Sequence, residues 1–225
     1  MELAKLALDV GLFTNQPDAL LPFWQHEVGL PFDQTLPVGG GVHQLRHRIG
    51  ESILKINHSR DPLPETPVSG YRSLRIATPG IDSDRPLTDP DNNRVTLIPV
   101  GTDRVTQLEL TVAARSIEAH TDFYERVLGL ERLDERRFSC GESLLALDAA
   151  PNQADNSDMP GRGFRYITLQ VFDVVTEHAR ILDRGGIEGR APVRLGEVAY
   201  ISFVRDPDGN WIEISQRKSL TGSLD

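Results

Sequence analysis

The sequence predicts an α+β fold built from repeats of one small unit, a strand followed by a helix and three strands. Self-similarity at a fixed spacing is the main observation that predicts it. Four pairs of segments match in the same order in both halves: 23–30 with 123–130, 50–57 with 141–148, 71–76 with 164–169, and 89–98 with 206–215. We therefore expect two tandem halves, 1–100 and 104–218.

The second half shows the predicted elements most clearly. Residues 105–112 alternate between polar and apolar side chains, as a half-buried strand does. A helix is expected from Ser116 to Gly129, because serine favours helix starts and glycine favours helix ends. Three short strands should complete the unit. The same order then returns, in this sequence: strand 164–169, a helix from Asp173 to Gly185, and strands up to 211–215.

The first half begins with an alternating strand at 3–10, but its second unit is shorter. Ser73 and Thr96 are 23 residues apart, whereas the matching Tyr166 and Glu213 are 47 residues apart. The missing length corresponds to about one helix and one strand. The second unit of the first half is therefore expected to lack its helix.

Composition restricts the class of protein. The chain has 225 residues and a formal net charge of −9, which disfavours nucleic acid or an anionic membrane surface as a partner. No apolar run reaches the roughly 18 residues that a membrane helix needs. The single Cys140 excludes an internal disulfide framework. We expect a cytoplasmic protein with a small-molecule partner.

The helix sequence FYERVLGL at 123–130 and the turn and strand DPDGNWIEI at 206–214 resemble the vicinal oxygen chelate superfamily. That superfamily contains glyoxalases, bleomycin-resistance proteins and extradiol dioxygenases. The resemblance implies paired modules whose sheets curl into cupped half-barrels. It also implies a divalent metal ion inside the cup, namely Mn, Fe, Ni or Zn, and the fold often forms homodimers.

Carried over residue by residue, the resemblance places Gln107, Ala146, Tyr166 and Glu213 at the usual metal-ligand positions. Gln107 and Glu213 fit that role, whereas Ala146 offers no donor atom. Tyr166 stands where family members have histidine, and its phenol has an ordinary pKa of about 10. Gln107 and Glu213 alone supply few of the roughly six oxygen donors that a hard cation takes.

Strand alternation gives candidate ligand-binding side chains on the inner faces of the strands. The inward set of the second half is acidic and that of the first half is basic. Glu213 is the candidate general base, and Tyr166 and Tyr200 are candidate proton donors. The candidate substrate-binding residues are Lys5, Lys55, Glu109, Thr168, Gln170 and Trp211. The alternative roles for these side chains are salt bridges and packing.

The histidines do not fall at the ligand positions implied by the resemblance. His43 and His47 would stand about 13 Å apart on a strand. If the modules pair in a permuted order, His43 or His58 could enter the cup of the second half.

These features predict a glyoxalase-like or dioxygenase-like enzyme of lyase, isomerase or ring-cleaving type that uses the C-terminal cup. A metal-free protein that binds or sequesters a small molecule, like the bleomycin-resistance branch, is the alternative. A third possibility is a protein with filled cups whose surface mediates dimerisation.

Overall fold

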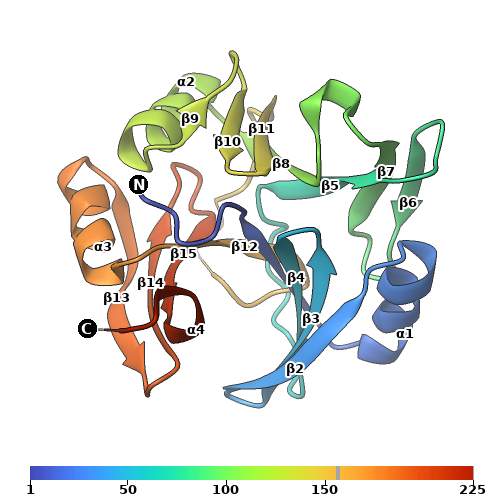
Figure 1. Cartoon of the computed structure of the whole chain (residues 1–225), viewed down its shortest axis with the longest axis horizontal. Coiled ribbons are helices and arrows are strands. Elements are labelled where there is room, and N and C mark those ends of the chain that lie inside the picture. The colour runs from blue at the N-terminus through green and yellow to red at the C-terminus, as the bar shows by residue number, and fades with distance from the viewer. Residues whose placement is uncertain (156–157, 225) are drawn as a thin grey trace.

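The computed structural model describes residues 1–155 and 158–224, and two curved sheets dominate it (Figure 1). Within these residues the larger sheet has eight strands. Its order is β13 (Ile187–Leu195), β14 (Ala199–Arg205), β15 (Trp211–Arg217), β12 (Gly163–Gln170), β1 (Asp9–Thr14), β4 (Ser52–Ser59), β3 (Val42–Ile49) and β2 (Phe32–Gly39).

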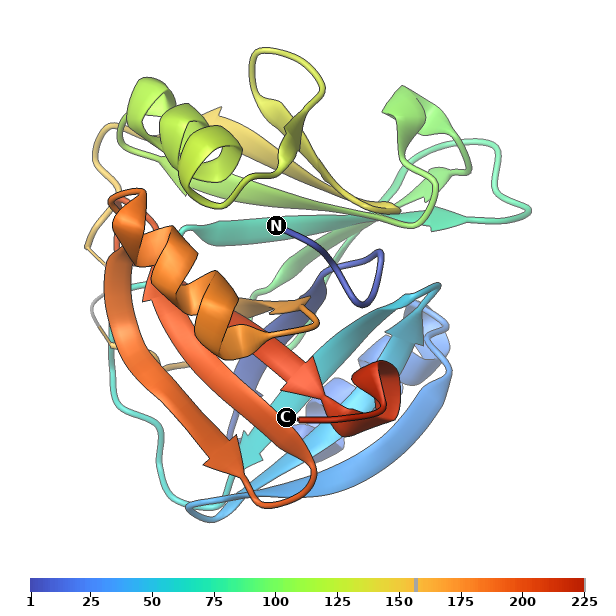
Figure 2. The ribbon, with the colours of Figure 1, turned by 60° about the vertical axis from the view of Figure 1, so that its left-hand side comes forward.

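The smaller sheet has seven strands in the described part of the chain. Its order is β6 (Arg85–Thr88), β7 (Arg94–Pro99), β5 (Tyr71–Thr78), β8 (Leu108–Ala114), β11 (Ser143–Ala149), β10 (Arg137–Cys140) and β9 (Glu131–Arg132). The helical segments are α1 (Pro17–Pro22) with η1 (Phe23–Glu27), η2 (Thr102–Arg104), α2 (Ile117–Asp122) with η3 (Phe123–Val127), α3 (Val174–Asp183) and α4 (Lys218–Thr221). The longer ones, formed by α1 with η1, α2 with η3, and α3, lie on the outer sides of the two sheets (Figure 2).

The predicted α+β fold of repeated modules is confirmed. The helix expected from Ser116 starts there, because the Ser116 side chain accepts a hydrogen bond from the Ala119 amide. Asp173 caps α3 in the same way through the Thr176 amide. Between β5 and β7 the chain forms only the short strand β6, as the reduced spacing predicts. The first strand starts later than expected, at Asp9, since Leu3 makes only an isolated bridge to Val171.

The pairing of the modules crosses between the two halves. Strand β1 pairs antiparallel with β12, which joins the first module to the last. Strand β5 pairs antiparallel with β8, which joins the two middle modules. The permuted order is thus the one that the structure has, and neither half closes a cup by itself. The boundaries 1–100 and 104–218 remain a prediction about the units of duplication.

The repeated Asp-Pro-Asp turns connect the sheets to the helices. The Asp206 carboxylate accepts hydrogen bonds from the amide of Asp208 (2.9 Å), the amide and side chain of Asn210 (2.9 and 2.8 Å) and the hydroxyl of Tyr124 (3.1 Å). The matching Asp89 binds its own turn and the Trp24 indole in the same manner. The turn therefore holds the helix of the neighbouring module, which explains why the helix and turn motifs repeat together.

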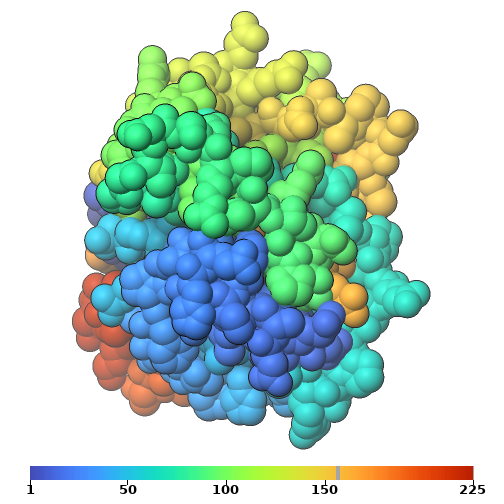
Figure 3. All heavy atoms as spheres, turned by 90° about the vertical axis from the view of Figure 1, so that its right-hand side faces the viewer, coloured from blue at the N-terminus to red at the C-terminus, as the bar shows by residue number. Residues whose placement is uncertain are grey.

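The same contacts give the molecule one continuous interior. The main hydrophobic cluster draws buried side chains from all four modules. Figure 3 shows the blue residues of the first module packed directly against the green residues of the second.

Among the helices that the structure describes, none is long and apolar enough to cross a bilayer.

Candidate ligand-binding cup

A cavity of about 670 Å³ lies on the inner face of the eight-stranded sheet. Its walls are mainly apolar, and its floor is polar. The walls include Phe13, Leu36, Pro37, Val38, Val42, Leu195, Val198, Ile201 and Phe203. The floor side chains are Gln44, Lys55, Asn57, Tyr166 and Glu213. An apolar pocket with a few converging polar groups is the usual form of a small-molecule site.

Lys55 and Glu213 form an ion pair in the floor. The Lys55 Nζ atom lies 3.0 Å from Glu213 Oε2 and donates a hydrogen bond to Thr168 Oγ1 at 2.6 Å. The Thr168 hydroxyl in turn donates to Glu213 Oε2 at 2.6 Å. Asp9 Oδ2 lies 3.9 Å from the same ammonium group. The arrangement follows from strand register, since Asp9 is opposite Thr168 and Thr168 is opposite Glu213.

Burial and charge act against each other on Lys55. The side chain is only 2% exposed, and burial lowers the pKa of the ammonium group, while Glu213 and Asp9 partly offset that effect. A buried cation without partners would be strongly unfavourable, so the carboxylates stabilise it. The pair thus places an ammonium group and a carboxylate side by side in the floor of the cavity.

Tyr166 presents a neutral phenol to the cavity. Burial, together with the Glu213 charge, raises the pKa of Tyr166 above its ordinary value. The side-chain amides of Gln44 (3.3 Å) and Asn57 (3.2 Å) both donate to the Tyr166 hydroxyl oxygen. Two accepted bonds leave the hydroxyl hydrogen free to be donated to a ligand.

Glu213 keeps one oxygen for a ligand. Its Oε2 atom receives both hydrogen bonds of the floor. Its Oε1 atom has no hydrogen-bond partner among residues 1–155 and 158–224, and the side chain is 13% exposed. This oxygen is therefore able to accept a proton from a molecule in the cavity.

The structure does not bring Gln107 to Glu213. Gln107 precedes β8 in the seven-stranded sheet, and its side-chain oxygen accepts the backbone amide of Glu51 at 2.6 Å. Glu109 also belongs to that sheet, where it pairs with Arg75 at 2.8 Å. The reason is the crossed pairing of the modules, which puts β8 and β15 in different sheets.

Other side chains expected in the cup are also displaced from the cavity. Tyr200 packs against the main core, because its strand neighbours Ala199 and Ile201 face the cavity and strand side chains alternate. Trp211 does not line the cavity and packs edge-on against Phe203. His43 and His58 face away for the same reason of alternation, since Gln44 and Asn57 point inward.

Lys5 and Gln170 line a smaller adjoining cavity and not the cup itself. Lys5 forms an ion pair with Asp9 there. Gln44 and Arg217 contribute to the cup although the sequence did not single them out. Both residues lie on the inward faces of their strands, β3 and β15, but the inward faces can be recognised only once the strand partners are known.

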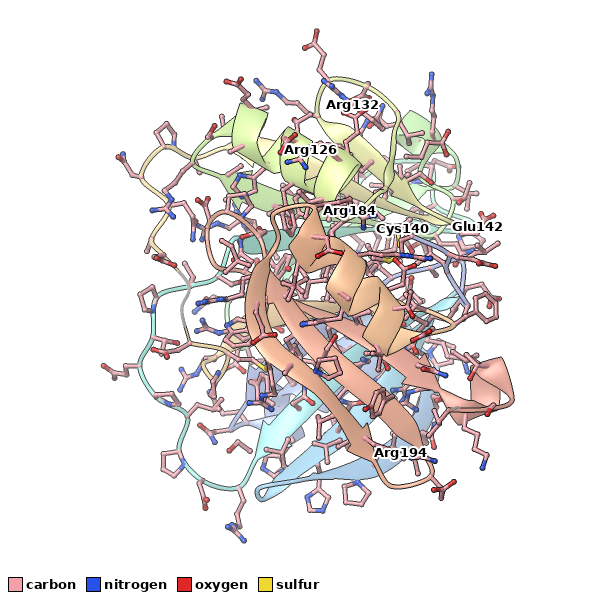
Figure 4. All side chains as sticks on the ribbon, turned by 90° about the vertical axis from the view of Figure 1, so that its left-hand side faces the viewer. Arg126, Arg132, Cys140, Glu142, Arg184 and Arg194 are labelled. Atoms are coloured by element: carbon pink, nitrogen blue, oxygen red, sulfur yellow. The ribbon has the colours of Figure 1, made fainter. Side chains whose placement is uncertain are left out.

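Figure 4 shows Cys140 where the two sheets meet, and burial raises the pKa of its thiol to about 12.

The floor residues do not fit a divalent metal ion. Within the described residues no cluster of three His, Cys, Asp or Glu side chains could hold one. The Lys55 ammonium group lies between Asp9 and Glu213, where its charge repels a second cation. The carboxylate that would serve as a ligand is already paired with a cation of the chain itself.

The fold and the cup define a class of protein in which paired modules of a strand, a helix and three strands curl around a cavity. The chain belongs to the Glyoxalase/Bleomycin resistance protein/Dioxygenase superfamily, whose sequence profile matches residues 106–214. It is 33% identical over 138 residues to a lactoylglutathione lyase of Pseudomonas aeruginosa, a match that covers 46% of this chain and 77% of that protein. A probable lactoylglutathione lyase of Synechocystis sp. is 28% identical over 126 residues, covering 50% and 95% of the two chains.

Solved structures show the same fold over the whole chain. Glyoxalase I from Zea mays superposes with a TM-score of 0.71 at 13% identity, covering 99% of this chain and 96% of that one. A mutant of the same enzyme gives a TM-score of 0.75 at 12% identity, with 100% and 96% covered. The predicted membership and the predicted cupped architecture of tandem modules are thus confirmed.

Proposed function

We propose that this protein is a glyoxalase-like enzyme that moves a proton next to the carbonyl group of a small molecule bound in the cup. The observation that carries the proposal is the convergence of Lys55, Tyr166 and Glu213 on one cavity. An isomerase or lyase needs a base and a group that stabilises the developing oxyanion. The cup offers both without a metal ion.

Each floor residue has a distinct role in this proposal. Glu213 Oε1 takes the proton from the carbon beside the carbonyl group. The Tyr166 hydroxyl and the Lys55 ammonium group donate to the carbonyl oxygen and stabilise its negative charge as the proton leaves. Protonation of the oxygen then gives the enol isomer, and return of a proton from Glu213 to the same carbon restores the carbonyl compound. The apolar walls exclude water, which strengthens these charge interactions.

The substrate test begins with carbonyl compounds. Because several relatives are named lactoylglutathione lyases, S-lactoylglutathione belongs in the panel with small 2-oxo acids. We expect the protein to exchange the hydrogen next to the carbonyl group for deuterium in D₂O. Proton NMR of the compounds measures this exchange directly. EDTA should leave the rate unchanged, because the proposed groups all belong to the chain.

Glu213→Gln should lower the exchange rate by about a hundredfold or more, which is typical of losing a general base. The glutamine keeps an oxygen for the Lys55 and Thr168 hydrogen bonds, so the floor should remain folded. Glu142→Gln is the matched control, because Glu142 is an exposed glutamate in the turn between β10 and β11, outside the cup. Exchange at equal rates in Glu213→Gln and the wild type would contradict the assignment.

A metal-free binding protein is the second candidate. The predominantly apolar walls favour it, as does the ion pair that neutralises Glu213. Tight binding of a ligand in the cup with no exchange for any compound of the panel would select this function.

A further inference from the structure

A smaller cavity of about 310 Å³ adjoins the cup, and Arg217 lines both cavities. We call it the arginine recess. The charged side chains that define it are Lys5, Asp9, Asp33, Arg46, Arg48 and Arg217, and Glu51 lies at its edge. Four basic and three acidic side chains line the recess, so its formal charge is one positive unit.

Two of the basic groups are already paired. Lys5 forms an ion pair with Asp9. Arg48 donates two hydrogen bonds to Asp33 Oδ1, at 3.0 and 2.7 Å. These pairs account for two of the three acids, and Glu51 is exposed. The excess positive charge therefore belongs to Arg46 and Arg217.

Arg46 is buried with most of its hydrogen-bonding capacity unused. The residue is 6% exposed, and its Nη1 atom donates to Gln44 Oε1 at 3.0 Å. Its Nε atom is fully buried and has no hydrogen-bond partner in the described chain. The nearest carboxylate oxygen to that atom is Asp33 Oδ2, at 3.8 Å. A buried donor without a partner is costly, so a ligand oxygen at this position would stabilise it.

Arg217 is the second unused guanidinium group. Its side chain makes no hydrogen bond or ion pair with any residue in the ranges 1–155 and 158–224, although it is only partly exposed. Arg46 and Arg217 line the same recess of about 310 Å³. Burial, followed by repulsion from Arg217, lowers the pKa of Arg46, in agreement with that placement. Arg46 has only the 3.8 Å approach of Asp33 Oδ2, and Arg217 has no ion pair in the described residues, so the two guanidinium groups of the recess form a site for an anion.

We propose that Arg46 and Arg217 bind the carboxylate group of the substrate, so that the cup takes an oxo acid with an apolar substituent. A carboxylate fits better than a phosphate dianion, because the recess has one net positive charge. Arg46 lies directly opposite Lys55 on the neighbouring strand, which places the acid group beside the carbonyl-binding floor. The apolar substituent then fills the cup. This inference rests on the proposed function of the cup and names its substrate class.

The test compares an acid with its neutral counterpart. We would titrate 2-oxo-4-phenylbutanoate and its primary amide into the protein by calorimetry at fixed ionic strength. The wild type should bind the acid about tenfold or more tightly, as expected for one charge-assisted contact. Arg217→Gln should reduce this preference severalfold, because Arg46 alone then attracts the carboxylate, and circular dichroism should show that the variant is folded. Arg60→Gln is the charge-matched control, because Arg60 is exposed and paired with Asp61.

The outcomes separate this inference from the proposed function. Equal affinity of the wild type for acid and amide would overturn the anion site. An acid preference that is undiminished in Arg217→Gln, or reduced equally in Arg60→Gln, would also overturn it. Amide binding would in each case still support the cup. Binding of neither compound would overturn both the anion site and the proposed oxo-acid chemistry.

Discussion

Gly11 determines how closely strand β1 can approach the Tyr166 ring. A Cβ atom added at this glycine would overlap the ring of Tyr166, and no backbone strain is involved because the φ angle is not positive. Gly11→Ala should therefore destabilise the protein by about 1–3 kcal/mol, the usual cost of overpacking. Urea unfolding measures that free energy. In a Tyr166→Ala background the same substitution should cost little, because the overlapping ring is gone. An equal cost in both backgrounds would refute this explanation.

At the scale of elements, His120 joins the helix α2 to the turn at Asp206. Its Nδ1 atom lies 2.9 Å from the Ser116 carbonyl oxygen and must donate to it. Its Nε2 atom lies 3.5 Å from both Asp206 and Asp208, so a neutral ring would direct a lone pair at two carboxylates. Burial alone would lower the pKa of His120, but Asp206, the Ser116 carbonyl group and Asp208 together outweigh burial and raise the pKa above its usual value of 6.5. The protonated ring therefore stabilises the contact between helix and turn.

This contact predicts a pH dependence of stability. A raised pKa in the folded state gives a contribution that is complete below about pH 6.5 and is lost as the pH rises through the folded-state pKa. Urea unfolding between about pH 5.5 and 8.5 should show the largest difference between wild type and His120→Gln at the acidic end. His26→Gln is the control, because His26 occupies the matching helix and is exposed. A gap that widens toward alkaline pH would contradict the protonated state.

At the scale of the whole molecule, the sequence predicts the modules but not their partners. Segment repeats fix the order of strands and helices, and the helix caps at Ser116 and Asp173 mark where helices begin. The repeats do not show which two modules pair to form a cup. The inward set of the first half is basic and that of the second half is acidic, and this charge pattern favours pairing across the halves. The structure pairs Lys55 with Glu213 and Arg75 with Glu109.

The floor of the cup could be predicted only in part, for the same reason. The inward positions of Glu213 and Tyr166 can be predicted from the alternation along their own strands, β15 and β12, and both residues line the cavity. Gln44 and Arg217 depend on the order of strands across the sheet, which needs β1 to lie between β4 and β12. Long-range pairing of this kind is decided by packing of the complete chain, and short sequence patterns do not record it.

The crossed pairing predicts how the halves behave when separated. A chain of residues 104–218 would leave β8 and β12 without their partners β5 and β1, and unpaired strand edges favour association. The isolated half should therefore form a dimer in which a second copy supplies the missing strands, or aggregate. Light scattering during size-exclusion chromatography measures its mass. Adding residues 1–100 during refolding should convert it to a 1:1 complex with the circular dichroism of the intact protein. A folded monomer of residues 104–218 would show that this half folds without the pairing of β8 with β5 and of β12 with β1. That result would contradict the prediction that the two halves fold together.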